Sequence, residues 1–265
     1  MNLEPLSLIL SGWVPMALIM VVLWLVQRGR PNTAIADVGW CGGFALIALW
    51  YAAATPGDLE RRLLIAAMAG IQAIRLGLYI LVDRVLGKAE DARYQTLRRK
   101  WGSRAPLCFF LYFQGQAVAI AVFSLPLLVL MSNPRSTFSV WELAGVAVWV
   151  IAVVGEAVAD RQLAHFRANP NNRGKTCRQG LWRYSRHPNY FFESLHWWAY
   201  VLMGIGVPNG WLTLIGPVLM TVALLKISGI PFAEAQALAS RGEDYREYQR
   251  TTSAFIPWFP KEERS

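Results

Sequence analysis

Long runs of uncharged, mostly apolar residues alternate along the chain with short polar segments. Residues Pro5 to Gln27, Val38 to Gly57 and Ala105 to Pro134 carry no charged side chain, and the last run is 30 residues long. About 20 apolar residues suffice for a helix to cross the hydrocarbon core of a bilayer. The pattern predicts an all-α polytopic membrane protein with seven transmembrane helices, over residues 5–27, 35–54, 63–82, 106–131, 138–159, 189–207 and 211–232.

Composition supports this class. Only 16% of the residues are charged, against roughly a quarter in soluble domains. Seven spans leave no room for a separate soluble domain, so we expect one transmembrane domain over residues 1–265. Glu4 stands where a signal peptide has basic residues, so the first span is expected to stay in the membrane. We expect an integral, multi-pass protein of a bacterial-type inner membrane, or of the endoplasmic reticulum in a eukaryote. The three scattered cysteines argue against a metal site or a disulfide framework.

The formal net charge of +9 is distributed unevenly. Loops 28–33, 83–105 and 161–188 and the tail from residue 226 hold 22 of the 26 Lys and Arg residues. By the positive-inside rule, the N-terminus faces out and the C-terminus is cytoplasmic. No basic stripe with interleaved aromatic residues lies outside these loops, so nucleic acid is not an expected partner.

Polar side chains inside the spans are candidates for a functional site, because such groups are costly in a bilayer. Helical spacing places them on single helix faces. The candidates are Gln72, Arg75, Tyr79 and Asp83 in the third span, Glu156, Asp160 and Arg167 at the end of the fifth, and Asn189, Glu193, His196 and Tyr200 in the sixth. Asp37 opens the second span and Glu234 closes the seventh. Apart from Tyr200, which should lie deeper, these groups fall towards the cytoplasmic side of the predicted topology.

Each group also has a structural interpretation. Asp37 can cap a helix, and Arg75 can form an ion pair that holds helices in register. Arg183 and Arg186 can anchor the chain at the membrane interface, and His196 beside two tryptophans can simply be packed there. Tyrosine and tryptophan residues elsewhere in the spans are expected in the aromatic belts and the core.

Basic residues accumulate just before the sixth span. Arg167, Lys175, Arg178, Arg183 and Arg186 precede the predicted N-terminus of that helix. Cations, backbone N–H donors and a helix dipole together form a site for phosphate or pyrophosphate. Asn189 and Glu193, one and two turns further in, can hydrogen-bond an amide or a ribose. No GxGxxG motif is present, which excludes a Rossmann domain as the means of binding a dinucleotide.

One string carries a family resemblance. GLWRYSRHPNYFFESLHWWAYVL (180–202) resembles the C-terminal signature of the membrane steroid 5-alpha-reductase family and its bacterial DUF1295-type relatives. DVGWCGGF (37–44), IRLGLYILVDRVLGKAEDARY (74–94) and GEDYREYQRTTSAFIPWFP (242–260) are similar to the same family. The likeness extends from about residue 34 to residue 260. The wider superfamily also includes isoprenylcysteine and phospholipid methyltransferases and sterol reductases.

The resemblance implies seven helices that enclose NADPH and a hydrophobic substrate that enters from the lipid. Asp37 stands where the steroid reductases have the glutamate of a Gln-Glu pair, and Gln72 where they have the tyrosine that touches the substrate ketone. We take Asp37, Gln72 and Tyr79 as catalytic candidates. The candidate NADPH-binding residues, on loops of the predicted cytoplasmic side and on helices two to seven, are Asp83, Asp160, Arg167, Lys175, Tyr184, Arg186, His187, Asn189, Glu193 and Glu234.

The expected reaction is reduction of a carbon–carbon double bond conjugated to a ketone. The substrate class is lipophilic: a 3-oxo-delta-4 steroid first, with a sterol, polyprenyl or fatty enone as other possibilities. A protonated Asp37 or the Gln72 amide would donate to the ketone oxygen, and water would supply the proton. Membrane lipid is an expected partner, a metal is not, and the protein is expected to be a monomer.

Two other functions remain open. Isoprenylcysteine-type methyltransferases, which use S-adenosylmethionine (SAM), share the Arg-His-Pro string but carry paired glutamates after the last span. Here that stretch reads Phe232-Ala233-Glu234-Ala235-Gln236, with one glutamate. Since SAM is a cation, the excess of Lys and Arg favours NADPH. The second alternative is a non-catalytic lipid-binding membrane protein, in which all the intramembrane polar groups would be structural.

Overall fold

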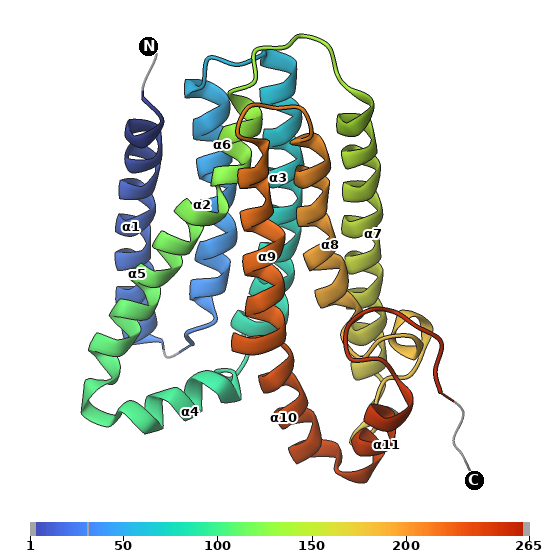
Figure 1. Ribbon diagram of the computed structural model, residues 1–265. Helices are drawn as coiled ribbons and strands as arrows, with labels where there is room; N and C mark the ends of the chain where they lie inside the picture. Colours follow the sequence, from blue (N-terminus) through green and yellow to red (C-terminus); the bar gives the residue numbers. More distant parts are fainter. Residues whose placement is uncertain (1–3, 31, 262–265) are drawn as a thin grey trace. The chain divides into compact units, whose positions relative to one another are not determined.

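The computed structural model describes residues 4–30 and 32–261, and this part of the chain is helical without any strand (Figure 1). It forms two compact units: Met1–Ser139 with Gly204–Ile215, and Val140–Met203 with Gly216–Ser265. We describe each unit by itself and call them unit 1 and unit 2. The single domain expected over the whole chain stays a prediction.

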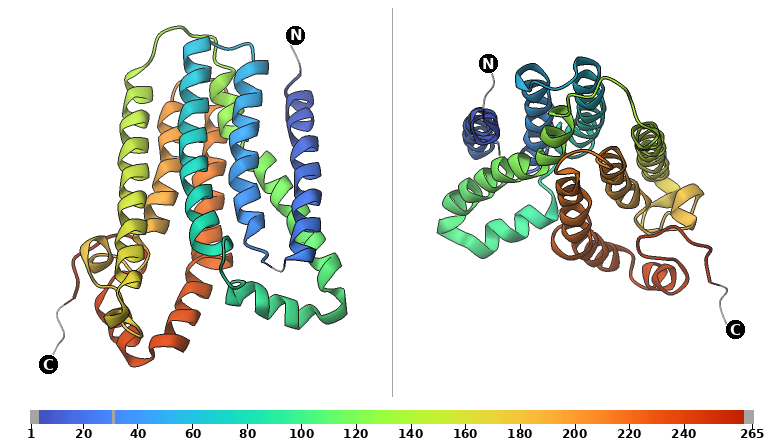
Figure 2. Two further views of the ribbon diagram at one scale, coloured as in Figure 1. Left: turned by 180° about the vertical axis from the view of Figure 1, so that it is seen from behind. Right: turned by 45° about the horizontal axis from the view of Figure 1, so that its top comes forward.

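Unit 1 is built on helices whose starts follow from local sequence. Pro5 occupies the first turn of α1, where a missing N–H costs nothing. Asp58 caps α3 by accepting from the backbone N–H of Arg61, and Asp91 caps α4 by accepting from that of Arg93. The helices are α1 (Pro5–Gly29), α2 (Ile35–Ala54), α3 (Leu59–Ile80), α4 (Ala92–Trp101), α5 (Ala105–Phe123) and α6 (Leu125–Met131). α2 packs against α3, and α1 packs against α2 and α5 (Figure 2).

Unit 2 contains the longest helix, α7, which packs along α8 (Figure 1). Their contact is close because Gly145 of α7 lies against α8: a Cβ there would come within 2.7 Å of the carbonyl oxygen of Ala199. A side chain at this position would therefore separate the helices. The helices are α7 (Val140–Ala168), α8 (Pro188–Met203), α9 (Ile215–Val222), α10 (Ile230–Arg241) and α11 (Glu243–Thr251).

The helices fit a multi-pass integral membrane protein. Within the described residues, six helices are long and apolar enough to cross a bilayer: Pro5–Gly29, Ile35–Ala54, Leu59–Val85, Ala92–Met131, Val140–Ala168 and Gly210–Arg241. One face of α1 carries apolar side chains that are 48–66% exposed, at Leu6, Leu10, Val14, Leu18, Val22 and Leu25. Such a row suits contact with lipid. The expected sixth span corresponds to α8, which has only 16 residues. The count of seven spans and the orientation of the termini stay predictions.

Three spans differ in their limits from the sequence expectation. The fourth is divided at Ser124 into α5 and α6, because Pro126 in the first turn of α6 lacks an N–H for the preceding helix. The fifth continues to Ala168, nine residues beyond 159. The seventh begins as a 3₁₀ turn (Gly210–Leu214) and widens into a π turn at Ala223–Ile227.

Candidate active site

Asp37 lies in the first turn of α2, but its side chain does not cap that helix. Instead its carboxylate accepts three side-chain donors. The Tyr94 hydroxyl lies 3.2 and 3.1 Å from Oδ1 and Oδ2, the Tyr112 hydroxyl lies 3.5 Å from Oδ1, and Nη2 of Arg93 lies 3.4 Å from Oδ2. We call these four residues the phenol cluster. In this arrangement Asp37 lies within hydrogen-bond distance of three donor groups, and its expected role as a donor to the substrate ketone stays a prediction.

The two phenols are themselves in contact. Their hydroxyl oxygens lie 3.0 Å apart, and Nη2 of Arg93 donates to the Tyr94 oxygen over 2.7 Å. A phenol carries one proton. When Tyr94 gives its proton to the hydrogen bond with Asp37, the proton of Tyr112 goes either to the Tyr94 oxygen or to Oδ1 of Asp37, and a ligand that accepts this proton would replace these contacts. Tyr94 is buried and Tyr112 is half-buried, so the Tyr112 side chain is the more exposed of the two.

The other catalytic candidates lie along α3. Nε of Arg75 donates to Oε1 of Gln72 over 3.2 Å, so these two side chains meet one turn apart. Tyr79 lies near the end of α3, and Asp83 follows in the π turn Leu81–Val85, which alters the straight helical register. Gln72 is buried, and Tyr79 and Asp83 are half-buried. Among the described residues, the side-chain partners of Asp37 do not include these three.

A clamp of hydrogen bonds around Glu90, beside the phenol cluster, holds α4 in place. Glu90 accepts Nη2 and Nε of Arg98 at 2.8 and 3.1 Å, and the backbone N–H and hydroxyl of Thr33 at 3.1 and 2.8 Å. Burial raises the pKa of Glu90, but the hydrogen bonds from Arg98 and Thr33 outweigh it and leave the pKa below its usual value. This clamp ties the start of α2 to α4, the helix that carries Arg93 and Tyr94.

In unit 2, two of the candidate cofactor-binding residues, Asn189 and Asp160, are in contact. Nδ2 of Asn189 donates to Oδ1 of Asp160 over 3.2 Å. Oδ1 of Asn189 is buried and has no hydrogen-bond partner within the part of the chain that the structure describes. One turn deeper, Nδ1 of His196 lies 2.7 Å from the carbonyl oxygen of Glu193 and 3.6 Å from its carboxylate. A buried hydrogen-bond acceptor without a partner is costly, so the position of Asn189 Oδ1 suits a ligand that donates a hydrogen bond.

Glu234 of α10 contacts side chains from two parts of the chain. Arg186 and His187 directly follow the GLWRYS string, and Tyr245 and Gln249 belong to α11. Oε1 of Glu234 accepts Nε of Arg186 at 2.7 Å and lies 3.3 Å from Nε2 of His187, while Oε2 accepts Nε2 of Gln249 at 2.8 Å. The Tyr245 hydroxyl lies 3.5 Å from Oε1. Burial, helped by the Glu234 charge, raises the pKa of Tyr245 to about 12. Burial lowers the pKa of His187, although Glu234 opposes it.

The tail after α11 is fastened to this cluster. Nη1 of Arg186 donates to the carbonyl oxygens of Gln249 and Thr252 at 3.1 and 2.6 Å, and its backbone N–H donates to that of Ser253 at 2.8 Å. The backbone N–H of Trp258 donates to the carbonyl oxygen of Tyr184 at 2.9 Å. The intramolecular bonds of Arg186, His187 and Glu234 therefore order the tail, and their role in cofactor binding stays a prediction.

Three basic residues of the 161–188 loop differ in their surroundings. Arg178 is bound by Asp244 and Glu247 of α11, at 3.1 and 3.0 Å, and holds the loop in place. Arg167 and Lys175 are exposed. Burial raises the pKa of Cys177, and the charges of Arg167 and Arg241 partly offset it.

A family model described as "Protein of unknown function (DUF1295)" matches residues 23–252. The chain belongs to the DUF1295 family. No curated protein and no solved structure matches it. The matched range of this DUF1295 protein includes every predicted site residue, from Asp37 to Glu234, whereas the tail from residue 253 lies outside it.

The sequence analysis missed three members of the phenol cluster of this DUF1295 protein. Tyr112 was assigned with the other aromatic residues to belt and core, and Arg93 and Tyr94 lie in a loop interpreted as a topology signal. One signal was present: Tyr112 is a polar group within an uncharged run of 30 residues, where such groups are costly.

Proposed function

We propose that this DUF1295 protein is a membrane-embedded, NADPH-dependent reductase of a carbon–carbon double bond conjugated to a ketone. The substrate class is lipophilic, and a 3-oxo-delta-4 steroid is the first candidate because the 180–202 string resembles the steroid 5-alpha-reductase signature. The observation that carries the proposal is the phenol cluster: two hydroxyls and a guanidinium gathered on Asp37 at the start of a predicted membrane span.

The reaction adds a hydride to the beta carbon and a proton to the alpha carbon, and negative charge develops on the ketone oxygen between these events. When bound, NADPH supplies the hydride. In our proposal Tyr112 donates a hydrogen bond to the ketone oxygen, because it is the more exposed of the two phenols. Tyr94, Asp37 and Arg93 orient it, and the guanidinium charge stabilises the developing anion. Water supplies the proton to the alpha carbon.

The residues of unit 2 fit the chemistry of the cofactor. The partnerless oxygen of Asn189 suits an amide N–H or a ribose hydroxyl, as NADPH offers. The exposed cations Arg167 and Lys175 suit its phosphates. Asp160 and Glu193 lie beside Asn189 and would complete the polar end of the site.

The contacts of Glu234 favour NADPH over SAM. A methyltransferase that binds a cationic cofactor benefits from carboxylates that face the ligand. Here one glutamate is present, and Arg186, His187 and Gln249 already engage both of its oxygens. Its negative charge is balanced within the chain, which leaves little attraction for a cation.

The deciding experiment measures binding of NADPH and SAM to the purified protein in detergent. We expect NADPH to bind and SAM not to bind. Arg167→Ala and Lys175→Ala should each weaken NADPH binding tenfold or more, since a charge-assisted contact is worth about 1.5–3 kcal/mol. NADH should lose less if either residue contacts the ribose phosphate.

Arg246→Ala is the matched control, because Arg246 is exposed and paired with Glu243 on α11. Its NADPH affinity should equal that of the wild type. Binding of SAM in place of NADPH would replace the proposal with the methyltransferase alternative, and binding of neither would favour the non-catalytic lipid-binding protein.

A further inference from the structure

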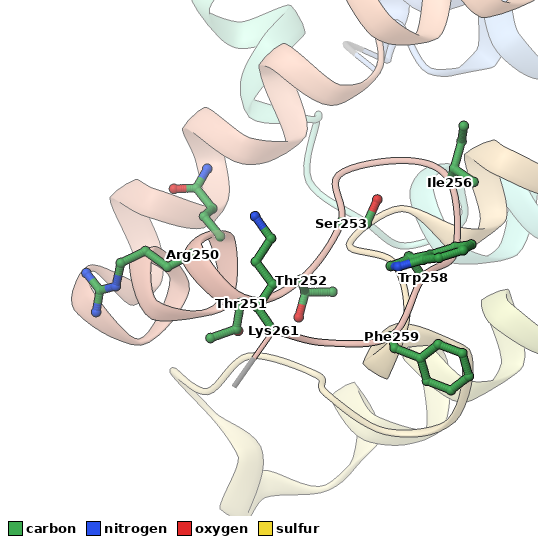
Figure 3. Close-up of a pocket in the computed structure, with 9 residues that line it drawn as sticks. Arg250, Thr251, Thr252, Ser253, Ile256, Trp258, Phe259 and Lys261 are labelled. Carbon is green, nitrogen blue, oxygen red and sulfur yellow. The ribbon is translucent and has the colours of Figure 1, made fainter. Parts of the chain in front are cut away.

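The last described residues form a largely exposed apolar tip, which contacts the rest of the described chain through an edge-on ring pair of Phe259 with Tyr184. Ile256, Trp258 and Phe259 are 62%, 70% and 74% exposed. They line a pocket of about 420 Å³ together with residues 249–253 and Lys261 (Figure 3). Exposed tryptophan and phenylalanine side chains that lie close together in the sequence indicate a binding surface.

The tip is held at the point where a helix begins. The backbone N–H of Trp258 donates to the carbonyl oxygen of Tyr184, four residues before Pro188 begins α8. The backbone N–H of Lys261 donates to the carbonyl oxygen of Thr251 at 2.8 Å, which closes the tail into a loop. Tryptophan and phenylalanine held beside the start of an apolar helix are placed as residues of a membrane-interface belt are.

The charged side chains of the pocket are both cationic. Among the residues that the structure describes, Arg250 and Lys261 are the charged side chains that line it. In Figure 3 the amine of Lys261 lies on the same side of the pocket as Arg250, and Trp258 and Phe259 lie on the other side. Arg250 also pairs with Glu243 at 2.9 Å, but both side chains are more than half exposed, so water screens that pair. Hydroxyl and cationic groups beside exposed aromatic rings match a phosphate attached to an apolar tail.

We propose that residues 249–261 form a binding site for an anionic phospholipid of the bilayer that the chain spans. Lys261 and Arg250 bind the phosphate, and Ile256, Trp258 and Phe259 lie among the glycerol and upper acyl groups. The site is independent of the reductase proposed above. A protein partner fits less well, because a stable interface needs about 800 Å² on each side and some 20 residues.

The first test measures the depth of Trp258 in vesicles. The protein is reconstituted in phosphatidylcholine with phosphatidylglycerol, in which some lipids carry bromine near the headgroup end of the acyl chains. The fluorescence that Trp258→Phe removes is the signal of Trp258. We expect bromine to quench this signal. Trp197→Phe is the control, because Trp197 is only 1% exposed and its signal should not be quenched. An unquenched Trp258 overturns the proposal.

The second test measures binding of fluorescent phosphatidylglycerol to the protein in detergent. Lys261→Gln and Arg250→Gln should each weaken it about fivefold, the size expected for one basic residue at an anionic surface. Arg246→Gln is the matched control: Arg246 lies on the same helix and pairs with the same Glu243, but it does not line the pocket.

The affinity of the control variant Arg246→Gln for phosphatidylglycerol should not change. An equal loss in Arg246→Gln overturns the site in favour of general surface charge. Equally effective competition by inorganic phosphate overturns the lipid assignment and leaves an anion site. Weaker competition by phosphate and by phosphatidylcholine supports the proposal.

Discussion

At the residue scale, Tyr94 and Tyr112 both contact Asp37, but their surroundings differ and so do their proposed roles. Tyr94 is buried between Arg93 and the carboxylate, so its hydroxyl holds the cluster together. Tyr112 contacts the cluster from α5 and is half-buried. A substrate can approach Tyr112 more readily than Tyr94, because the Tyr112 side chain is the more exposed of the two.

Replacing Tyr112 tests this division. Tyr112→Phe removes the proposed donor to the ketone oxygen, and loss of such a donor lowers turnover about 100- to 1000-fold. NADPH affinity should stay unchanged, and the melting temperature should fall little, since one half-buried hydrogen bond contributes only about 1 kcal/mol. The measurement is turnover of a model enone in detergent beside a melting curve. Wild-type turnover in this variant would contradict the assignment and direct attention to Gln72 or Tyr79.

Glu90 gives a prediction on pH. Its folded pKa lies below the ordinary 4.5, so its stabilising effect is complete above pH 4.5 and is lost as pH falls through the folded pKa. Glu90→Gln should lower the free energy of unfolding by about 1–3 kcal/mol at neutral pH. Melting curves over a pH series should show this deficit shrinking in acid. Glu60→Gln, at an exposed site, is the control. A deficit that persists unchanged in acid would contradict the role of the carboxylate charge.

At the scale of elements, Arg186 acts as the fastening between the start of α8 and the tail. One guanidinium reaches Glu234 and two carbonyl oxygens of the chain around α11. Lysine carries the same charge but lacks the planar fork that makes these contacts at once. The position of the tail therefore depends on the shape of this side chain and not only on its charge.

Hydrogen exchange tests the fastening. In Arg186→Lys the amides of Trp258 and Lys261 should exchange about tenfold faster, because local opening of the tail becomes about 1.4 kcal/mol easier. Amides within α7 should exchange as in the wild type. Arg183→Lys, at an exposed neighbouring position, is the matched control and should not change the tail. Equal protection of the tail in both variants would show that backbone bonds alone hold it.

At the scale of the whole molecule, the charge distribution predicts the orientation in the membrane. Loops rich in Lys and Arg remain on the cytoplasmic side. Reporters fused after Ser265 and inserted in loop 161–188 should both read cytoplasmic. An external signal from either one would contradict the predicted orientation and would move the candidate cofactor residues to the outer face.

The sequence by itself determined the class of the molecule and the approximate positions of its long apolar helices. Uncharged runs such as 105–134 predicted membrane helices, because a bilayer tolerates few charges whatever the neighbouring elements are. Asp160 and Asn189 were both candidates for the cofactor site, and the structure brings them within hydrogen-bond distance. The break at Ser124 was not foreseen, although Pro126 was visible, because a proline in a span can also be tolerated without a break.

Only the tertiary structure decided which polar groups meet. Asp37, Tyr94 and Tyr112 come from three helices, and no periodicity within one helix brings them together. Asp37 could be a cap, a donor or an acceptor from its position in the sequence. In the tertiary structure it does not cap α2 and lies within hydrogen-bond distance of Arg93, Tyr94 and Tyr112. Helical patterns describe one element at a time, whereas a hydrogen-bonded cluster depends on how elements distant in sequence pack against each other.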